Sequence, residues 1–81
     1  MITNDELKRY LLTFEDVFHV EVEGDGHHYQ LIVVSDVFER KTKLARQQWV
    51  YVKLNDFIRS GQLHAVNMKT WTKAEWEKQH G

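Results

Sequence analysis

The 81-residue sequence contains no cysteine, no proline and only four glycines. Without cysteine the chain can form no disulfide, no thiolate zinc site and no thiol nucleophile, and it has no thiolates of its own with which to hold an iron–sulfur cluster. Its longest central apolar run, Leu31-Ile32-Val33-Val34, is far shorter than the roughly 20 residues that cross a bilayer. Because the N-terminus also lacks the basic and then apolar pattern of a signal peptide, we expect a cytoplasmic protein without membrane contact.

Charge is distributed unevenly along a chain of otherwise ordinary globular composition. Hydrophobic residues make up 42% and charged residues 28%, and we expect one domain spanning residues 1–81. Residues 1–38 hold two basic and eight acidic side chains, whereas residues 39–81 hold nine basic and four acidic ones. The densest basic segment contains Arg40, Lys41, Lys43 and Arg46. Such a segment is typical of a solvated helix start, and the alternative is a surface that contacts a few phosphates.

Two segments have the S/T-x-x-E spacing of a capping box, in which a hydroxyl and a carboxylate cap the first turn of a helix. Thr3-Asn4-Asp5-Glu6 predicts a helix over about residues 4–13, where apolar residues recur at helical spacing. Thr72-Lys73-Ala74-Glu75 predicts a short terminal helix, and we expect Trp76 to dock that helix on a sheet.

Alternation of apolar and polar residues predicts two strands after the first helix. Phe18, Val20 and Val22 alternate with polar residues, so we expect a half-buried strand with these three side chains inward. Gly24-Asp25-Gly26 predicts a turn in which the glycines supply positive φ angles. The apolar run between His28 and Ser35 predicts a central strand that is covered on both faces.

The following segment predicts helical structure and then a third strand. From about Thr42 to Arg59 the sequence favours one helix or two, ended by Ser60-Gly61, with Trp49 partly packed. The expected buried face comprises Leu44, Gln48, Tyr51, Leu54 and Ile58, with Val50 and Phe57 alongside. Residues 63–69 predict the third strand. Since a short turn joins antiparallel strands and a helical link allows a right-handed parallel crossover, we expect an α+β fold of order α-β-β-α(α)-β-α with a three-stranded mixed sheet.

The five histidines are the strongest borderline metal ligands in the chain. If the second and third strands are parallel neighbours, His28 and His64 begin them at the same sheet edge. Neighbouring strands lie about 4.8 Å apart, so two imidazoles at this edge can converge on a metal centre. His27 points away from His28 if both lie in regular strand. The alternative is that His64 bonds within the sheet and that His27 and His28 are ordinary turn residues. We expect His19 and His80 to be solvated.

Several motifs spread over nearly the whole chain resemble the BolA family in order and spacing. They are His28-Tyr29-Gln30-Leu31-Ile32-Val33-Val34-Ser35, Phe38, Arg46, Leu63-His64-Ala65 and Thr72-Lys73-Ala74-Glu75-Trp76. The short Gly24-Asp25-Gly26 turn, Gln47-Gln48, Val50-Tyr51 and His64-Ala65-Val66 are most similar to its IbaG branch. This resemblance implies a fold similar to the class II KH domain.

The same resemblance implies a non-enzymatic adaptor that binds a monothiol glutaredoxin and shares with it a glutathione-supported 2Fe–2S cluster, in iron–sulfur trafficking or in iron and stress regulation. In the family pattern, His64 matches the common ligand and the hairpin loop supplies a second, for which we favour His28 over His27. The chain alone is expected to be a monomer or a weak homodimer. It carries no Gly-rich phosphate loop or H-E-x-x-H motif that would indicate an enzyme.

An alternative function implied by the resemblance is transcription regulation through a KH-like nucleic-acid-binding surface. Its residues would be Arg40, Lys41, Lys43 and Arg46, with weak DNA binding. The sequence departs from the family at two positions, because Arg40 replaces the glycine of an F-x-G element and Lys73 replaces a proline. The loop at Arg40 therefore lacks the backbone freedom of glycine, and we do not expect a function there that needs close backbone approach.

Overall fold

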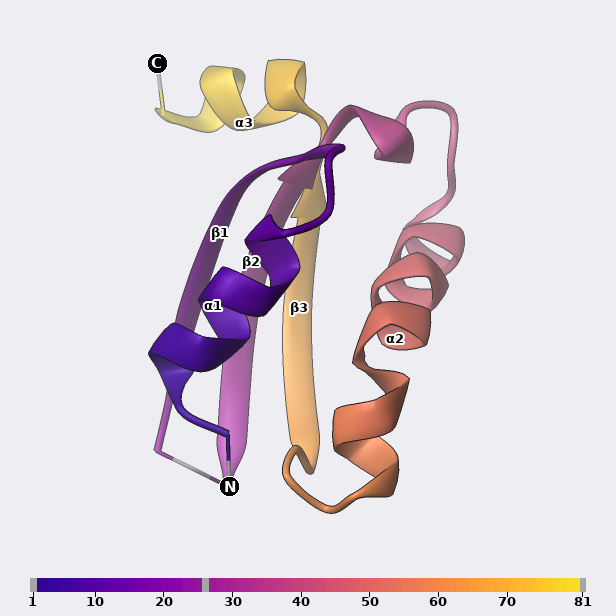
Figure 1. Cartoon of the computed structure of the whole chain (residues 1–81). Coiled ribbons are helices and arrows are strands. Elements are labelled where there is room, and N and C mark those ends of the chain that lie inside the picture. Colours follow the sequence, from indigo (N-terminus) through magenta and orange to yellow (C-terminus); the bar gives the residue numbers. More distant parts are fainter. Residues whose placement is uncertain (1, 26, 81) are drawn as a thin grey trace.

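The computed structural model describes residues 2–25 and 27–80, and its elements follow the predicted order (Figure 1). They are α1 (Asn4–Leu12), β1 (Val17–Gly24), β2 (His28–Ser35), the 3-10 helix η1 (Asp36–Phe38), α2 (Lys43–Arg59), β3 (Ala65–Trp71) and α3 (Lys73–His80). The described strands form one sheet in the order β1-β2-β3, with β1 and β2 antiparallel and β2 and β3 parallel. The expected α+β fold and mixed sheet are therefore confirmed.

Both predicted capping boxes form. The Thr3 hydroxyl accepts from the amide of Glu6 at 3.1 Å, and the Glu6 carboxylate accepts from the amide of Thr3. At the start of α3, the Thr72 hydroxyl accepts from the amide of Glu75 at 3.2 Å, while Glu75 accepts from the amide of Thr72 at 2.8 Å. Each box satisfies backbone donors that a helix start otherwise leaves unpaired, which fixes where α1 and α3 begin.

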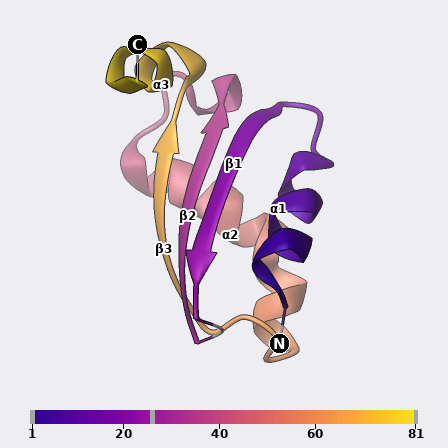
Figure 2. The ribbon, with the colours of Figure 1, turned by 90° about the vertical axis from the view of Figure 1, so that its left-hand side faces the viewer.

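Helices α1 and α2 cover one face of the sheet, and α3 lies at the end where β2 and β3 finish (Figures 1 and 2). On the covered face, Tyr29, Leu31 and Val33 of β2 are buried in the core. On the opposite face, His28 and Gln30 are exposed. The prediction that β2 is covered on both faces is therefore wrong for its first half, because no described helix reaches that part of the open face.

A β-bulge changes which side chains of β1 face the core. The register passes from Val17 opposite Ser35 to His19 opposite Val34, so that Phe18 is the extra residue. Val17 is buried, whereas Phe18 is 52% exposed, with the Lys73 Nζ 5.1 Å from its ring centroid. The predicted inward position of Phe18 is wrong, since simple alternation does not hold across a bulge.

Residues 43–59 form a single helix, and its buried face is the predicted one only in part. Val50 and Leu54 are fully buried, whereas Leu44 is 64% and Tyr51 40% exposed. Trp49 is partly buried and packs edge-on against Phe38, with ring centroids 5.6 Å apart. The aromatic contact rotates the helix toward the Trp49 side, and burial of Val50 outweighs the weak helix propensity of a β-branched residue.

The link from α2 to β3 sets where the third strand begins. Gly61 has a φ of +80° just after the Ser60 C-cap, as expected of a glycine that ends a helix. Leu63 is buried and its amide donates to the Phe57 carbonyl at 3.1 Å. This anchor delays the strand, which runs over Ala65–Trp71 instead of the predicted residues 63–69.

Arg40 has a left-handed backbone with a φ of +62°, the one positive φ of a non-glycine residue in the described part of the chain. The loop that it occupies joins η1 to α2, and the amide of Lys41 donates back to the Phe38 carbonyl at 3.1 Å. Arginine thus adopts here the left-handed conformation that a glycine takes without strain. The loop keeps it at the steric cost that a Cβ carries there, about 1–2 kcal/mol.

Replacing Arg40 with glycine should therefore stabilise the fold. Relief of the left-handed strain, less the entropy that glycine adds to the unfolded chain, leaves about 0.5–1 kcal/mol, or roughly 2–8 °C in Tm for a domain of this size. Thermal unfolding followed by circular dichroism would measure it, with Arg40→Ala as the control that removes the charge but not the strain. A Tm of Arg40→Gly at or below that of Arg40→Ala would contradict the strain.

Candidate functional site

The parallel pairing of β2 and β3 brings the β1–β2 hairpin loop and His64 to the same edge of the sheet. His28 begins β2 and lies opposite Ala65, the first residue of β3. His64 directly precedes Ala65. The side chains of His27, His28 and His64 are all exposed. The predicted convergence of these three histidines on one edge, named here the histidine edge, follows from this register.

The register also shows how the two hairpin histidines differ. Because His28 pairs with Ala65, continuing the same register places His27 level with His64. His28 lies on the open face, since its neighbour Tyr29 is buried on the helix side. His28 and His64 thus do not begin their strands in line, as the sequence suggested, but one residue apart. Among the described residues, no three or more histidine, aspartate or glutamate side chains gather to hold a metal ion.

Asp25 and Gly24 hold the hairpin loop in place. The Asp25 carboxylate accepts from the amides of both His27 and His28, each at 2.9 Å. The backbone hydrogen bond from His28, followed by that from His27, lowers the pKa of Asp25 below its ordinary value. A Cβ on Gly24 would lie 2.7 Å from the His28 carbonyl oxygen, so glycine is needed here for close approach and not for positive φ. The predicted positive φ at Gly26 lies outside the described residues.

His19 lies at the other end of the sheet, where α3 docks. Its Nε2 lies 2.8 Å from a Glu21 carboxylate oxygen, and its ring stacks on Trp76 with centroids 5.1 Å apart. The side chain remains 41% exposed, so the predicted solvation of His19 is only partly right. Trp76 is half-buried and docks α3 as expected. The side chain of His80, also predicted to be solvated, lies outside the described residues.

Arg46, one of the four residues of the alternative nucleic-acid surface, makes several internal contacts. Its Nη1 lies 2.8 Å from a Glu75 carboxylate oxygen and also donates to the Thr70 carbonyl, while its Nε donates to the Lys41 carbonyl at 3.1 Å. Only 14% of the Arg46 side chain is exposed. The hydrogen bond from Arg46, followed by that from the Thr72 backbone, lowers the pKa of Glu75 below its ordinary value. This pair ties α2 to α3.

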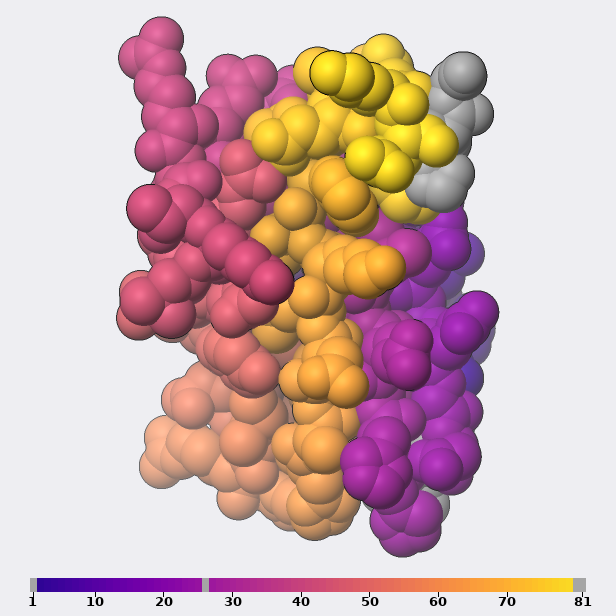
Figure 3. All heavy atoms as spheres, turned by 180° about the vertical axis from the view of Figure 1, so that it is seen from behind, coloured from indigo at the N-terminus to yellow at the C-terminus, as the bar shows by residue number. Residues whose placement is uncertain are grey.

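The other predicted phosphate contacts have different surroundings. Arg40 and Lys43 are exposed, whereas the Lys41 Nζ donates to the Val37 carbonyl at 2.7 Å. Lys41, Lys43 and Arg46 line one hollow of about 560 Å³ between α2, β3 and α3, named here the basic hollow, on the side of the molecule shown in Figure 3. Its remaining lining residues are Met68, Lys69, Thr70, Trp71, Glu75, Lys78 and Gln79. The sequence alone did not connect Lys69 and Lys78 with this basic segment.

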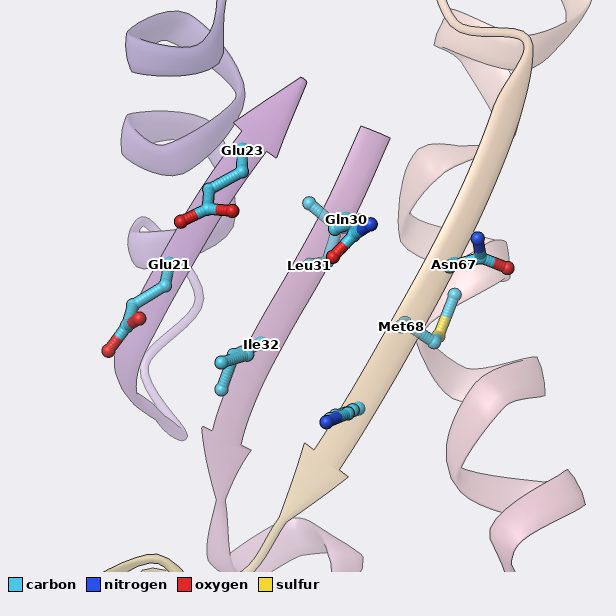
Figure 4. A pocket seen from close by; sticks show the side chains of 8 residues that line it. Glu21, Glu23, Gln30, Leu31, Ile32, Asn67 and Met68 are labelled. Atoms are coloured by element: carbon cyan, nitrogen blue, oxygen red, sulfur yellow. The ribbon is translucent and has the colours of Figure 1, made fainter. Parts of the chain in front are cut away.

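A second, smaller hollow of about 200 Å³ lies on the open face of the sheet. Glu21 and Glu23 of β1, Gln30 of β2 and Asn67 of β3 are among the residues that line it (Figure 4), and Lys69 of β3 lines it as well. This face is therefore acidic along β1 and carries a cation on β3.

Of the helices described, none combines the length and apolar character needed to cross a bilayer.

Comparisons with known proteins agree with this architecture. The family model "BolA-like protein" matches residues 13–75. The acid stress protein IbaG of Escherichia coli K12 is 36% identical over 75 residues, which cover 93% of this chain and 89% of that protein. A bolA protein homologue from Coxiella burnetii has a TM-score of 0.84 and 35% identity, covering 95% of this chain and 99% of its own. The BolA domain of SufE1 from Arabidopsis thaliana has a TM-score of 0.76 and 30% identity, covering 93% and 98%.

The Arg46–Glu75 pair predicts an acid-sensitive part of the stability. Because the folded pKa of Glu75 is lowered, its contribution is fully present above the ordinary pKa of glutamate and is lost as the pH falls through the folded value. Glu75→Gln should therefore be less stable than wild type at neutral pH, with the difference shrinking toward about pH 3. Urea unfolding at both pH values would measure it, with Glu77→Gln on the same helix as the control. Equal losses for the two variants would contradict the role of the pair.

Proposed function

Because this chain belongs to the BolA family, in its IbaG branch, we propose that it is a non-enzymatic adaptor that binds a monothiol glutaredoxin and shares a glutathione-supported 2Fe–2S cluster with it. The observation that carries the proposal is the histidine edge, where the parallel β2–β3 register brings His64 beside the loop that contains His27 and His28. On this proposal the chain acts in iron–sulfur trafficking or in iron and stress regulation.

The donor set at this edge fits one half of such a cluster. The chain has no cysteine, so its strongest available ligands are neutral imidazoles. Within the described residues, the rings of His27, His28 and His64 accept or donate no hydrogen bond, whereas the ring of His19 is held by Glu21. The exposed rings are therefore available to a second molecule, and the sulfur ligands would come from the glutaredoxin cysteine and glutathione.

The surrounding residues would position these ligands. Buried Leu63 fixes the backbone just before His64. Asp25 fixes the loop by accepting from the backbone amides of His27 and His28, so that its hydrogen bonds do not occupy the two rings. With an imidazole in place of a thiolate, a bound cluster carries less negative charge and has a higher reduction potential. His64 is proposed as one ligand, and His28 or His27 as the second.

The structure favours nucleic-acid binding less than the sequence did. Of the four residues predicted for that role, Arg46 is paired with Glu75 and Lys41 donates to a backbone carbonyl, which leaves Arg40 and Lys43 as the exposed cations of the segment. Two exposed charges predict weak binding with a shallow salt dependence. We therefore rank transcription regulation through DNA contacts below the adaptor function.

The proposed function predicts a spectral change that depends on His64. Wild-type chain mixed with a monothiol glutaredoxin, iron, sulfide and glutathione should give a visible absorption and circular dichroism spectrum different from that of the glutaredoxin cluster alone. His64→Ala should abolish the difference, because one ligand of the shared cluster is lost. Comparison of His28→Ala with His27→Ala identifies the second ligand as the variant that behaves like His64→Ala.

The matched control is His19→Gln, at the opposite end of β1. It should assemble the complex as wild type does, since its ring lies against Trp76 and away from the histidine edge. A wild-type spectrum identical to that of the glutaredoxin alone would refute cluster sharing. An unaltered spectrum with His64→Ala would refute this edge as the site.

A further inference from the structure

The basic hollow, at the opposite end of β3 from His64, holds more positive charge than the protein itself neutralises. Four of its lining residues are lysines, and its single carboxylate, Glu75, is already paired with Arg46. Within residues 2–25 and 27–80, Lys43, Lys69 and Lys78 form no ion pair. In a chain of net charge −1, these three lysines around one hollow without a counterion favour a multiply charged anion there.

The start of α2 adds to this positive potential. The first turns of α1 and α3 carry acidic residues, Asp5 and Glu6 in one and Glu75 in the other. The first turn of α2 contains Lys43 and no acidic residue. The positive end of a 17-residue helix dipole is thus left without a negative partner beside the lysines.

The size and lining of the basic hollow indicate an organic ligand instead of a bare ion. Its volume of about 560 Å³ lies within the range of about 300–1,000 Å³ that small-molecule sites occupy. Met68 and Trp71 add apolar and aromatic surface beside the lysines. The indole Nε1 of Trp71 is buried and lacks a hydrogen-bond acceptor within the described structure. A ligand with a flat ring and several negative charges would match this lining, with the ring against Met68 and Trp71 and the charges at the lysines.

We propose that the basic hollow binds a phosphorylated small molecule of mononucleotide size, with its phosphates at the lysines and its ring against Met68 and Trp71. An extended nucleic acid fits less well, because the lysines surround one hollow and the adjoining open face carries Glu21 and Glu23. The inference goes beyond the adaptor function and uses none of the histidines, so either can fail without the other.

Calorimetric titration of the full chain with metal-free ATP tests the proposal, alongside adenosine, inorganic pyrophosphate and a single-stranded oligonucleotide. ATP should bind more tightly than adenosine or pyrophosphate, and added salt should weaken it. The double variant Lys69→Gln/Lys78→Gln should weaken ATP binding about tenfold, since two cation–phosphate contacts are lost. Lys8→Gln/Arg59→Gln removes the same net charge from exposed positions outside the hollow and should bind as wild type does.

Amide chemical-shift mapping locates the site, and the shifts should change in β3, in α3 and at the start of α2. His64→Ala should bind ATP as wild type does, which separates this test from that of the adaptor function. The proposal is overturned if adenosine or pyrophosphate binds as tightly as ATP, or if the two double variants lose affinity equally. It is also overturned if only the oligonucleotide binds, which would assign the hollow to nucleic acid.

Discussion

The parallel pairing of β2 with β3 is the constraint on which the proposed site depends. An antiparallel β3 would place His64 beside Ser35, at the far end of β2 from the hairpin loop. The parallel arrangement requires a crossover between the two strands, and α2 supplies it while burying Val50 and Leu54 against the sheet. The register also fixes the open face, because a slip of one residue would turn Tyr29 out of the core and His28 into it. Core packing therefore positions His28 and His64 through the backbone, with their side chains exposed.

The two ends of β3 are stabilised by different kinds of contact, which is compatible with ligand binding at one end and cluster binding at the other. At the C-terminal end, Arg46 and Glu75 join α2 to α3, and the Asp36 carboxylate accepts from the amide of Lys73 at 3.0 Å. At the N-terminal end, backbone contacts from Asp25 order the hairpin loop and leave the imidazoles exposed. One end is thus held together by side-chain pairs beside a basic hollow, and the other presents donors to a partner. A ligand at one end and a cluster at the other would not compete for the same residues.

The sequence predicted those features that depend on local chemistry or on simple topology. The two capping boxes and the glycine stop at Gly61 follow from residues near one another in the chain, and the mixed sheet follows from the kinds of connection between the strands. The outward Phe18 and the rotated face of α2 did not, since a bulge and the packing of Trp49 on Phe38 are decided by the assembled core. The three histidines were predicted at one edge because topology alone brings them there. The basic hollow was missed, because Lys69 and Lys78 join Lys41 and Lys43 only after β3 and α3 have packed beside α2.

On the proposed function, imidazole nitrogens of this chain ligate a cluster shared with a thiol-bearing partner. Pulsed paramagnetic resonance of the reduced complex, assembled from chain labelled with nitrogen-15 in its histidines and unlabelled glutaredoxin, tests it most directly. If His64 and one hairpin histidine are ligands, the electron spin should couple strongly to labelled nitrogen from both. Any cluster that His64→Ala retains should show a single coupled nitrogen. A spectrum with no coupling to labelled nitrogen in the wild-type complex would contradict the proposed ligation.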